Sequence, residues 1–231
     1  MKIAFYGDSL TVGQPGASFF KMLEGKLSEH ELLNYGKGGD TVISLYQRIK
    51  EDKLIPQTTL TFLWIGTNDV LAKASTPIKN TLNPPWVKDH KEFGDYYKLT
   101  LDLLSPLCEK LITVPPLFIG EDLNNPWNGE LKELAGIIEG LSANYSNVEY
   151  LDLRKIFLLK RQTKEPSDYI IQSRVRLMMD CGLTGIKEIN DQATERGLFF
   201  TLDGVHLNGP GATLVADAFF QTTNAYLKGE K

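Results

Sequence analysis

Five short apolar runs, separated by stretches long enough for a helix, constrain the fold of this chain most. The runs lie at residues 2–6, 32–35, 59–65, 111–114 and 148–151. Between them, apolar residues recur at helical spacing in segments 17–27, 42–53, 93–109 and 129–143. Strands that alternate with helices favour βαβ crossovers and a parallel sheet covered on both faces.

This rhythm predicts a flavodoxin-like, three-layer α/β/α sandwich with five parallel strands and a ligand site beyond their carboxyl ends. The rhythm breaks at about 154–198, where apolar groups predict two or three short helices, including residues 169–171, and no strand. We interpret this segment as a helical insertion within a single domain, 1–231. Whether it forms a cap, a core extension or a dimer surface is left open. A final helix is expected from about 209 to 227.

Composition and charge exclude several classes of protein. Hydrophobic residues make up 42% and charged residues 23%, as in a globular protein with a core. The net charge of −4 argues against nucleic acid or an anionic membrane as a partner. Cys108 and Cys181 make neither a disulfide framework nor a metal site. Without an export signal or an apolar run of ~20 residues, we expect a cytoplasmic protein with no integral membrane association. A homo-oligomer stays open.

A serine on a glycine-bearing turn follows the first apolar run, in the sequence Gly7-Asp8-Ser9-Leu10. In α/β proteins such a turn exposes a nucleophile, and a helix after it directs its positive dipole end there. Polar segments also follow the second and third runs, at 36–41 and 66–69. Because parallel strands end at one edge of a sheet, these three segments can meet in space.

The chain has three histidines that could act as a base for Ser9. His30 precedes the second strand, so we expect it at the opposite edge without a role. His90 lies in the loop after the third strand and competes, although only the adjacent Asp89 could orient it. His206 lies three residues after Asp203, and this spacing lets one ring nitrogen bind the carboxylate while the other faces the serine. We favour His206.

Four motifs together resemble a known family. They are Gly7-Asp8-Ser9-Leu10, Asn34-Tyr35-Gly36-Lys37-Gly38-Gly39-Asp40-Thr41, Gly66-Thr67-Asn68-Asp69 and Asp203-Gly204-Val205-His206. In order and spacing they are similar to the four blocks of the SGNH hydrolases, also called GDSL esterases and lipases. The resemblance covers residues 1–153 and 199–227. It does not cover 154–198 or the proline-rich loop at 77–90, which we expect to shape substrate choice.

The resemblance implies a role for each matching residue. Ser9 would be the nucleophile, His206 the general base and acid, and Asp203 the residue that orients His206. The oxyanion hole would consist of the backbone N–H groups of Ser9 and Gly39 and the side-chain amide of Asn68. The family places the glycine donor directly before Asp-Thr, which selects Gly39 over Gly38.

Two tryptophans, Trp86 and Trp127, are expected in loops at the active edge. They would either line the substrate pocket or pack the loops, and the sequence does not choose. Trp64, within the third strand, is expected in the core.

The resemblance implies a serine hydrolase that cleaves carboxylic esters through an acyl-enzyme on Ser9, without metal or cofactor. It permits lipases, thioesterases and carbohydrate O-deacetylases, and the sequence does not choose among them. A non-enzymatic alternative is a flavodoxin-like module that binds phosphate or flavin at 36–39. That segment lacks the P-loop pattern, and the alternative leaves Asp203 and His206 unexplained.

Overall fold

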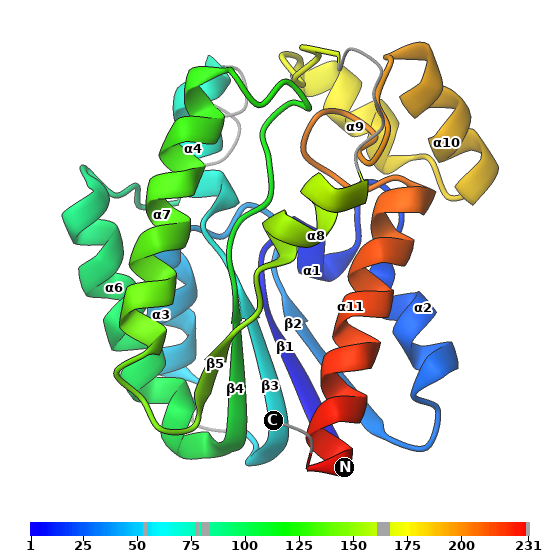
Figure 1. The fold of residues 1–231 in the computed structure, drawn as a ribbon. Helices are drawn as coiled ribbons and strands as arrows, with labels where there is room; N and C mark the ends of the chain where they lie inside the picture. The colour runs from blue at the N-terminus through cyan, green and yellow to red at the C-terminus, as the bar shows by residue number, and fades with distance from the viewer. Residues whose placement is uncertain (53–54, 77–78, 80–83, 161–166, 230–231) are drawn as a thin grey trace.

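A five-stranded parallel sheet lies between two layers of helices in the computed structural model, which describes residues 1–52, 55–76, 79, 84–160 and 167–229 (Figure 1). The strands are β1 (Lys2–Gly7), β2 (Glu31–Gly36), β3 (Thr58–Trp64), β4 (Cys108–Val114) and β5 (Val148–Tyr150). Their order is β2-β1-β3-β4-β5, and every pair is parallel. The predicted flavodoxin-like architecture is confirmed, and the strand order reverses at β1, which lies between β2 and β3.

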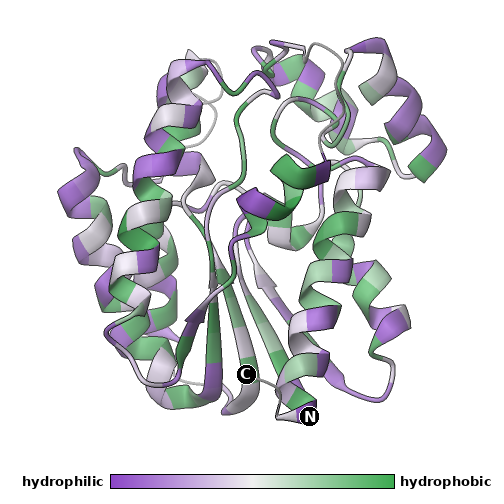
Figure 2. Ribbon diagram, viewed as in Figure 1, coloured by the Kyte–Doolittle hydropathy of each residue, from purple (hydrophilic) through white to green (hydrophobic). Residues whose placement is uncertain are grey.

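Both faces of the sheet are covered by amphipathic helices. One layer contains α2 (Phe19–Lys26), α8 (Leu153–Lys160) and α11 (Gly209–Lys228), and the other contains α3 (Val42–Glu51), α6 (His90–Leu104) and α7 (Pro126–Ser142). Apolar residues concentrate in the strands and on the inner sides of these helices, while polar residues face outward (Figure 2). In the described part of the chain, every helix is too short or too polar to cross a bilayer.

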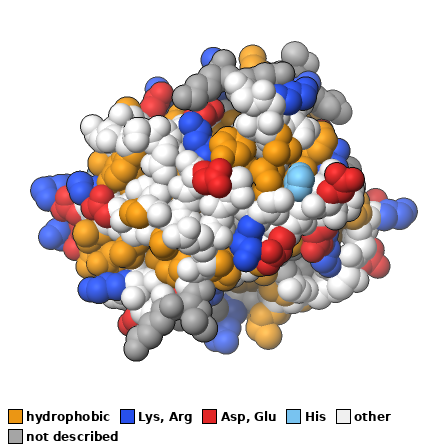
Figure 3. All heavy atoms as spheres, turned by 90° about the horizontal axis from the view of Figure 1, so that it is seen from below, with side chains coloured by type: hydrophobic (Ala, Val, Ile, Leu, Met, Phe, Trp, Pro, Cys, Tyr) orange, Lys and Arg blue, Asp and Glu red, His pale blue; other side chains and the backbone are white. Residues whose placement is uncertain are grey.

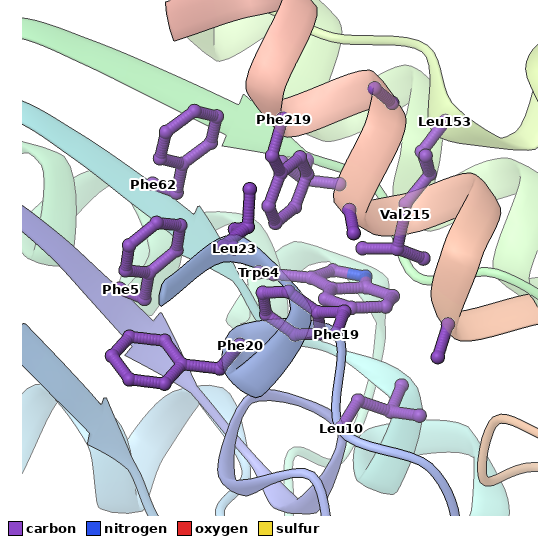
Figure 4. Close-up of a cluster of buried hydrophobic side chains, with 14 of the residues drawn as sticks. Phe5, Leu10, Phe19, Phe20, Leu23, Phe62, Trp64, Leu153, Val215 and Phe219 are labelled. Atoms are coloured by element: carbon purple, nitrogen blue, oxygen red, sulfur yellow. The ribbon is translucent and has the colours of Figure 1, made fainter. Parts of the chain in front are cut away.

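Aromatic side chains fill the core under α2 and α11 (Figure 4). Phe5 of β1 stacks on Phe62 of β3 with ring centroids 5.0 Å apart, and Phe219 of α11 stacks on Phe62 at 4.5 Å. Trp64 is buried as predicted, and its Nε1 donates to the carbonyl of Pro115 at 3.1 Å. These contacts hold the two strands whose carboxyl ends lead to Ser9 and Asn68.

Three local predictions are wrong. The helix expected at 93–109 ends at Leu104, because a 3₁₀ turn at Ser105–Leu107 contains Pro106, which has no N–H to continue an α-helix. Segment 169–171 is not helical, since the N–H of Ile171 donates to the carbonyl of Asp203 at 3.0 Å instead of to a helical turn. Helix α4 (Thr67–Ala74) follows β3 directly, where only a loop was expected.

The segment at 154–198 contains helices, as predicted: most of α8, then α9 (Arg174–Cys181) and α10 (Ile186–Glu195). It is fastened to the rest of the molecule on two sides. The side-chain amide of Gln14 donates to the carbonyl of Cys181 at 3.0 Å, and that of Gln172 donates to Ala74 at 3.1 Å. On α9, the apolar side chains of Val175, Met178 and Met179 remain exposed. Residues 161–166 of this segment, and 77–78 and 80–83 of the proline-rich loop, lie outside the described residues.

Candidate active site

Ser9 lies just after β1, with only Asp8 between them. It is the first residue of the one-turn helix α1 (Ser9–Val12), which Asp8 caps by accepting the N–H of Leu10 at 2.9 Å. The turn into this helix requires Gly7, because a Cβ there would lie 2.2 Å from Thr11 Oγ1 and 2.4 Å from the carbonyl oxygen of Trp64. The chain therefore turns sharply at the carboxyl edge of the sheet and presents the hydroxyl of Ser9.

The structure brings Ser9, His206 and Asp203 into one hydrogen-bonded line. Ser9 Oγ lies 3.0 Å from His206 Nε2, and His206 Nδ1 lies 2.7 Å from Asp203 Oδ2. The other carboxylate oxygen of Asp203 accepts the backbone N–H groups of Val205 at 3.0 Å and His206 at 2.8 Å. Gly204 between them has φ +86°, a conformation that L side chains rarely adopt. The loop thus fixes the carboxylate against the ring.

Burial and pairing act in opposite directions on the buried histidine and aspartate. Burial lowers the pKa of His206, but the charge of Asp203 and the hydrogen bond to it raise that pKa by more, so the net shift is upward. Burial raises the pKa of Asp203, but His206 and two backbone N–H groups lower it by more. The pair therefore favours an imidazolium next to a carboxylate once a proton arrives.

Gly39 and Asn68 lie in the segments that leave the neighbouring strands. In the parallel register, Gly7 is opposite both Gly36 of β2 and Trp64 of β3, so all three segments start at one level of the sheet. Gly39 has φ +80° in a turn closed by the N–H of Asp40, which donates to the carbonyl of Lys37 at 3.2 Å. Asn68 is in the first turn of α4 and is only 4% exposed.

The loop that carries Gly39 is held by Asp40 and Arg48. Arg48 Nε donates to Asp40 Oδ2 at 2.5 Å, and the same guanidinium donates to the carbonyl of Tyr35 at 2.5 Å. Ser44 Oγ donates to the other carboxylate oxygen of Asp40 at 2.9 Å. These bonds give Asp40 a structural role, because they hold the turn that carries Gly39.

Two more buried aspartates, Asp8 and Asp69, serve as helix and loop anchors. Asp69 Oδ2 accepts the N–H of Val42 at 3.1 Å, which joins α4 to α3. Burial raises the pKa of Asp8 to about 7 and that of Asp69 to about 8. Neither Asp8 Oδ2 nor Asp69 Oδ1 has a hydrogen-bond partner among the described residues. Both groups are thus poorly suited to carry a charge.

The competing histidines lie elsewhere. His90 is the first residue of α6, and its Nε2 lies 3.6 Å from Glu130 Oε2, a carboxylate that the sequence did not point to. Asp89, the expected orienting residue, instead caps α6 by accepting the N–H of Glu92 at 2.8 Å. His30 is next to the amino group of Met1 at the opposite edge, as predicted, with 3.4 Å between Nδ1 and the terminal nitrogen.

The two candidate pocket tryptophans differ in their surroundings. Trp86 lies in an irregular segment, as expected, and is half-buried. Trp127 was expected in a loop, but it lies in the first turn of α7, since Asn125 caps that helix and Pro126 starts it. Its ring packs half-buried against the core under α3, α6 and α7.

The opposite edge of the sheet also has a groove, with a cavity volume of about 640 Å³. It lies between β4, β5 and the end of α11, and the residues lining it include Glu109, Lys110, Asn147 and Tyr226 but no histidine. Seen from this edge, acidic, basic and apolar side chains are interspersed (Figure 3). Volume alone would favour this groove, but it lacks a base for its hydroxyl groups, so the chemistry favours the carboxyl edge. Across the described ranges, no group of three or more His, Cys, Asp and Glu could hold a metal ion.

A flavodoxin-like sandwich with a hydrogen-bonded serine, histidine and aspartate at its carboxyl edge is an arrangement of serine hydrolases. Residues 5–175 match the GDSL-like Lipase/Acylhydrolase family, and the chain belongs to this family. The resemblance drawn from the four motifs is therefore confirmed, and the chain is a hydrolase that acts on esters. No curated protein sequence is significantly similar to it.

Solved structures share the fold over nearly the whole chain. The acetyl xylan esterase AlAXEase is 24% identical with a TM-score of 0.67, covering 96% of this chain and 99% of its own. Axe2, an acetylxylan esterase from Geobacillus stearothermophilus, is 20% identical with a TM-score of 0.67, covering 95% and 92%. LAE5, an α/β hydrolase from the Lake Arreo metagenome, is 18% identical with a TM-score of 0.68, covering 96% and 94%.

Proposed function

We propose that the chain hydrolyses carboxylic esters through an acyl-enzyme on Ser9, with His206 as general base and acid and Asp203 as its orienting partner. The observation that carries this proposal is the continuous line from Ser9 Oγ through His206 to Asp203, with distances of 3.0 and 2.7 Å. Nothing else in the described part of the chain places a hydroxyl against a histidine that is paired with a carboxylate.

Each step is balanced by one proton on His206. Ser9 Oγ attacks the ester carbonyl carbon while Nε2 takes the hydroxyl proton, and the carbonyl oxygen becomes an oxyanion. The N–H groups of Ser9 and Gly39 and the amide of Asn68 would bind that oxyanion. Nε2 then gives the proton to the departing alcohol, leaving an acyl-enzyme. Water attacks the acyl group, with His206 again as base, and releases the acid and Ser9.

Small acyl groups, with acetyl first, are the substrates that we propose. Two of the similar structures are acetyl xylan esterases, and the structures of Axe2 include catalytic mutants in which a serine or an aspartate is replaced by alanine. Those replacements parallel the roles proposed for Ser9 and Asp203. A carbohydrate O-acetyl ester is therefore the first natural substrate class to test, ahead of a thioester or a long-chain lipid.

The test is a series of p-nitrophenyl acetate, butyrate and octanoate, with the wild type and Ser9→Ala compared. We expect turnover that falls with acyl length in the wild type and is lost in Ser9→Ala, while circular dichroism shows the same fold. A fluorophosphonate should label the wild type and not the variant. Equal turnover in both proteins would remove Ser9 as nucleophile, and a maximum at octanoate would contradict the small-acyl proposal.

A further inference from the structure

We infer that Glu121 is a positioning residue, whose carboxylate holds the segment that presents Asp203 and His206 to Ser9. The inference rests on the function proposed for those three residues. We call residues 199–208 the catalytic loop. Glu121 belongs to none of the four family motifs, and it reaches this loop from the segment between β4 and α7.

The carboxylate of Glu121 accepts four hydrogen bonds from three consecutive residues. Oε2 accepts the N–H of Phe199 at 2.7 Å. Oε1 accepts the N–H of Phe200 at 2.8 Å and both the N–H and the hydroxyl of Thr201, at 2.9 and 2.8 Å. The residue is 7% exposed and has no ion-pair partner among the described residues. These four donors are thus what offsets the cost of burying it.

Asn208 binds carbonyl groups in the segment that Glu121 also holds. Its backbone N–H donates to Phe200 at 3.1 Å, and its side-chain amide donates to Phe199 at 3.1 Å. A bridge between Thr201 and Leu207 then closes the base of the loop. Glu121 accepts the backbone N–H groups at the start of the catalytic loop, and Asn208 donates to its backbone carbonyls. The orientation of the loop therefore depends on both residues.

Glu121 is itself held rigidly. The N–H of its neighbour Gly120 donates to the carbonyl of Gly204, within the catalytic loop, at 2.6 Å. Ile119 is bound on both sides, since its N–H donates to Asn128 at 3.0 Å and its carbonyl accepts from Asn125 at 2.7 Å. The start of α7 therefore serves as a fixed support, and Glu121 transmits its position to the loop. A displacement of about 1 Å at a reacting group can reduce a rate roughly 10²-fold.

The test compares Glu121→Gln with Glu109→Gln. Glutamine keeps the size of the side chain and one acceptor oxygen, but it places an NH₂ group against a backbone N–H. We expect kcat for p-nitrophenyl acetate to fall about 10- to 100-fold, with KM changed little. Glu109, at the opposite edge, accepts a hydrogen bond from Tyr226 at 2.8 Å, so Glu109→Gln is a matched control that should keep the wild-type kcat.

A second readout does not need turnover. The proton between His206 Nδ1 and Asp203 should give a low-field NMR signal, and we expect Glu121→Gln to shift or broaden it. If the wild type has no Ser9-dependent turnover, the proposed function fails, while this signal still tests the position of the loop. If Glu121→Gln does not fold, Thr201→Val, which removes one of the four bonds, replaces it. A folded variant with unchanged kcat and signal, differing only in Tm, would overturn the inference.

Discussion

The side-chain amide of Asn68 donates a hydrogen bond to the carbonyl oxygen of Asp40 at 2.9 Å, which joins the first turn of α4 to the loop after β2. An amide nitrogen has two N–H groups, so this bond uses one and fixes the direction of the other. The proposed oxyanion donor is therefore oriented before substrate binds, which is the condition under which such donors contribute most to catalysis.

Replacing Asn68 by alanine should reduce kcat for p-nitrophenyl acetate by roughly 10²–10³-fold, the usual effect of losing one oxyanion donor. The fold should survive, because only one hydrogen bond to Asp40 is lost. Steady-state kinetics and circular dichroism measure both effects. A kcat within about twofold of the wild type, far short of the loss expected for a missing donor, would show that Asn68 does not contact the oxyanion.

Substituting alanine at Gly39 and at Gly38 tests which of the two glycines donates its backbone N–H to the oxyanion. A methyl group at Gly39 is strained, because its φ is +80°, whereas a Cβ at Gly38 meets nothing within 4 Å. We expect Gly39→Ala to displace its N–H and to lose kcat toward the roughly 10²-fold cost of a missing donor. Gly38→Ala should retain nearly wild-type kinetics, and the reverse ranking would assign the donor to Gly38.

His206→Ala should be far more damaging than His90→Ala. Without His206 the hydroxyl of Ser9 has no proton acceptor, and loss of the base in a serine hydrolase costs on the order of 10⁶-fold in kcat. His90, at the start of α6, faces Glu130 of α7 and contacts neither Ser9 nor Asp203. Its replacement should leave kcat essentially unchanged, and a large loss there would revive it as the base.

Asp69→Asn should change how stability depends on pH. Burial raises the pKa of Asp69 to about 8, so the folded protein keeps a proton that the unfolded chain releases near the ordinary aspartate pKa of 3.8. Between these values the unfolded state binds fewer protons, and wild-type stability therefore falls as pH rises.

Asparagine keeps an oxygen for the N–H of Val42 and carries no such proton. The Tm of Asp69→Asn minus that of the wild type should thus increase from about pH 4 to about pH 8, because only the wild type loses stability over this range, which the two pKa values set. A constant difference for Asp69→Asn would mean that the carboxyl of Asp69 is ionised in the folded protein.

Local patterns were enough to predict the layers of the fold and the residues that meet at its edge. Short β-branched and apolar runs identified the strands, and the three-residue spacing of Asp203 and His206 identified their pairing. Helix α4 was missed because its first turn, Thr67-Asn68-Asp69, uses residue types that also form turns. The strand order, too, depends on packing between elements and not on any one segment.

Long-range partners could not be predicted. Glu121 binds residues 78 to 80 positions away, and nothing in its immediate sequence distinguishes it from a surface glutamate. The position of Trp127 depended on a capping asparagine and a following proline, a helix-start signal that was present in the sequence but not used. Contacts between residues within one turn can thus be predicted from the sequence, while hydrogen bonds to another helix, strand or loop cannot.

The separation in sequence between Ser9 and His206 has a consequence for how the site assembles during folding. His206 follows Ser9 by 197 residues, so the two side chains meet only through long-range packing. Until the catalytic loop and α11 have packed on β1, the hydroxyl of Ser9 has no neighbouring base and is no more reactive than any other serine alcohol. Under the proposed mechanism, partly folded chains are therefore protected from acylation, and reactivity begins only when α11 is in place.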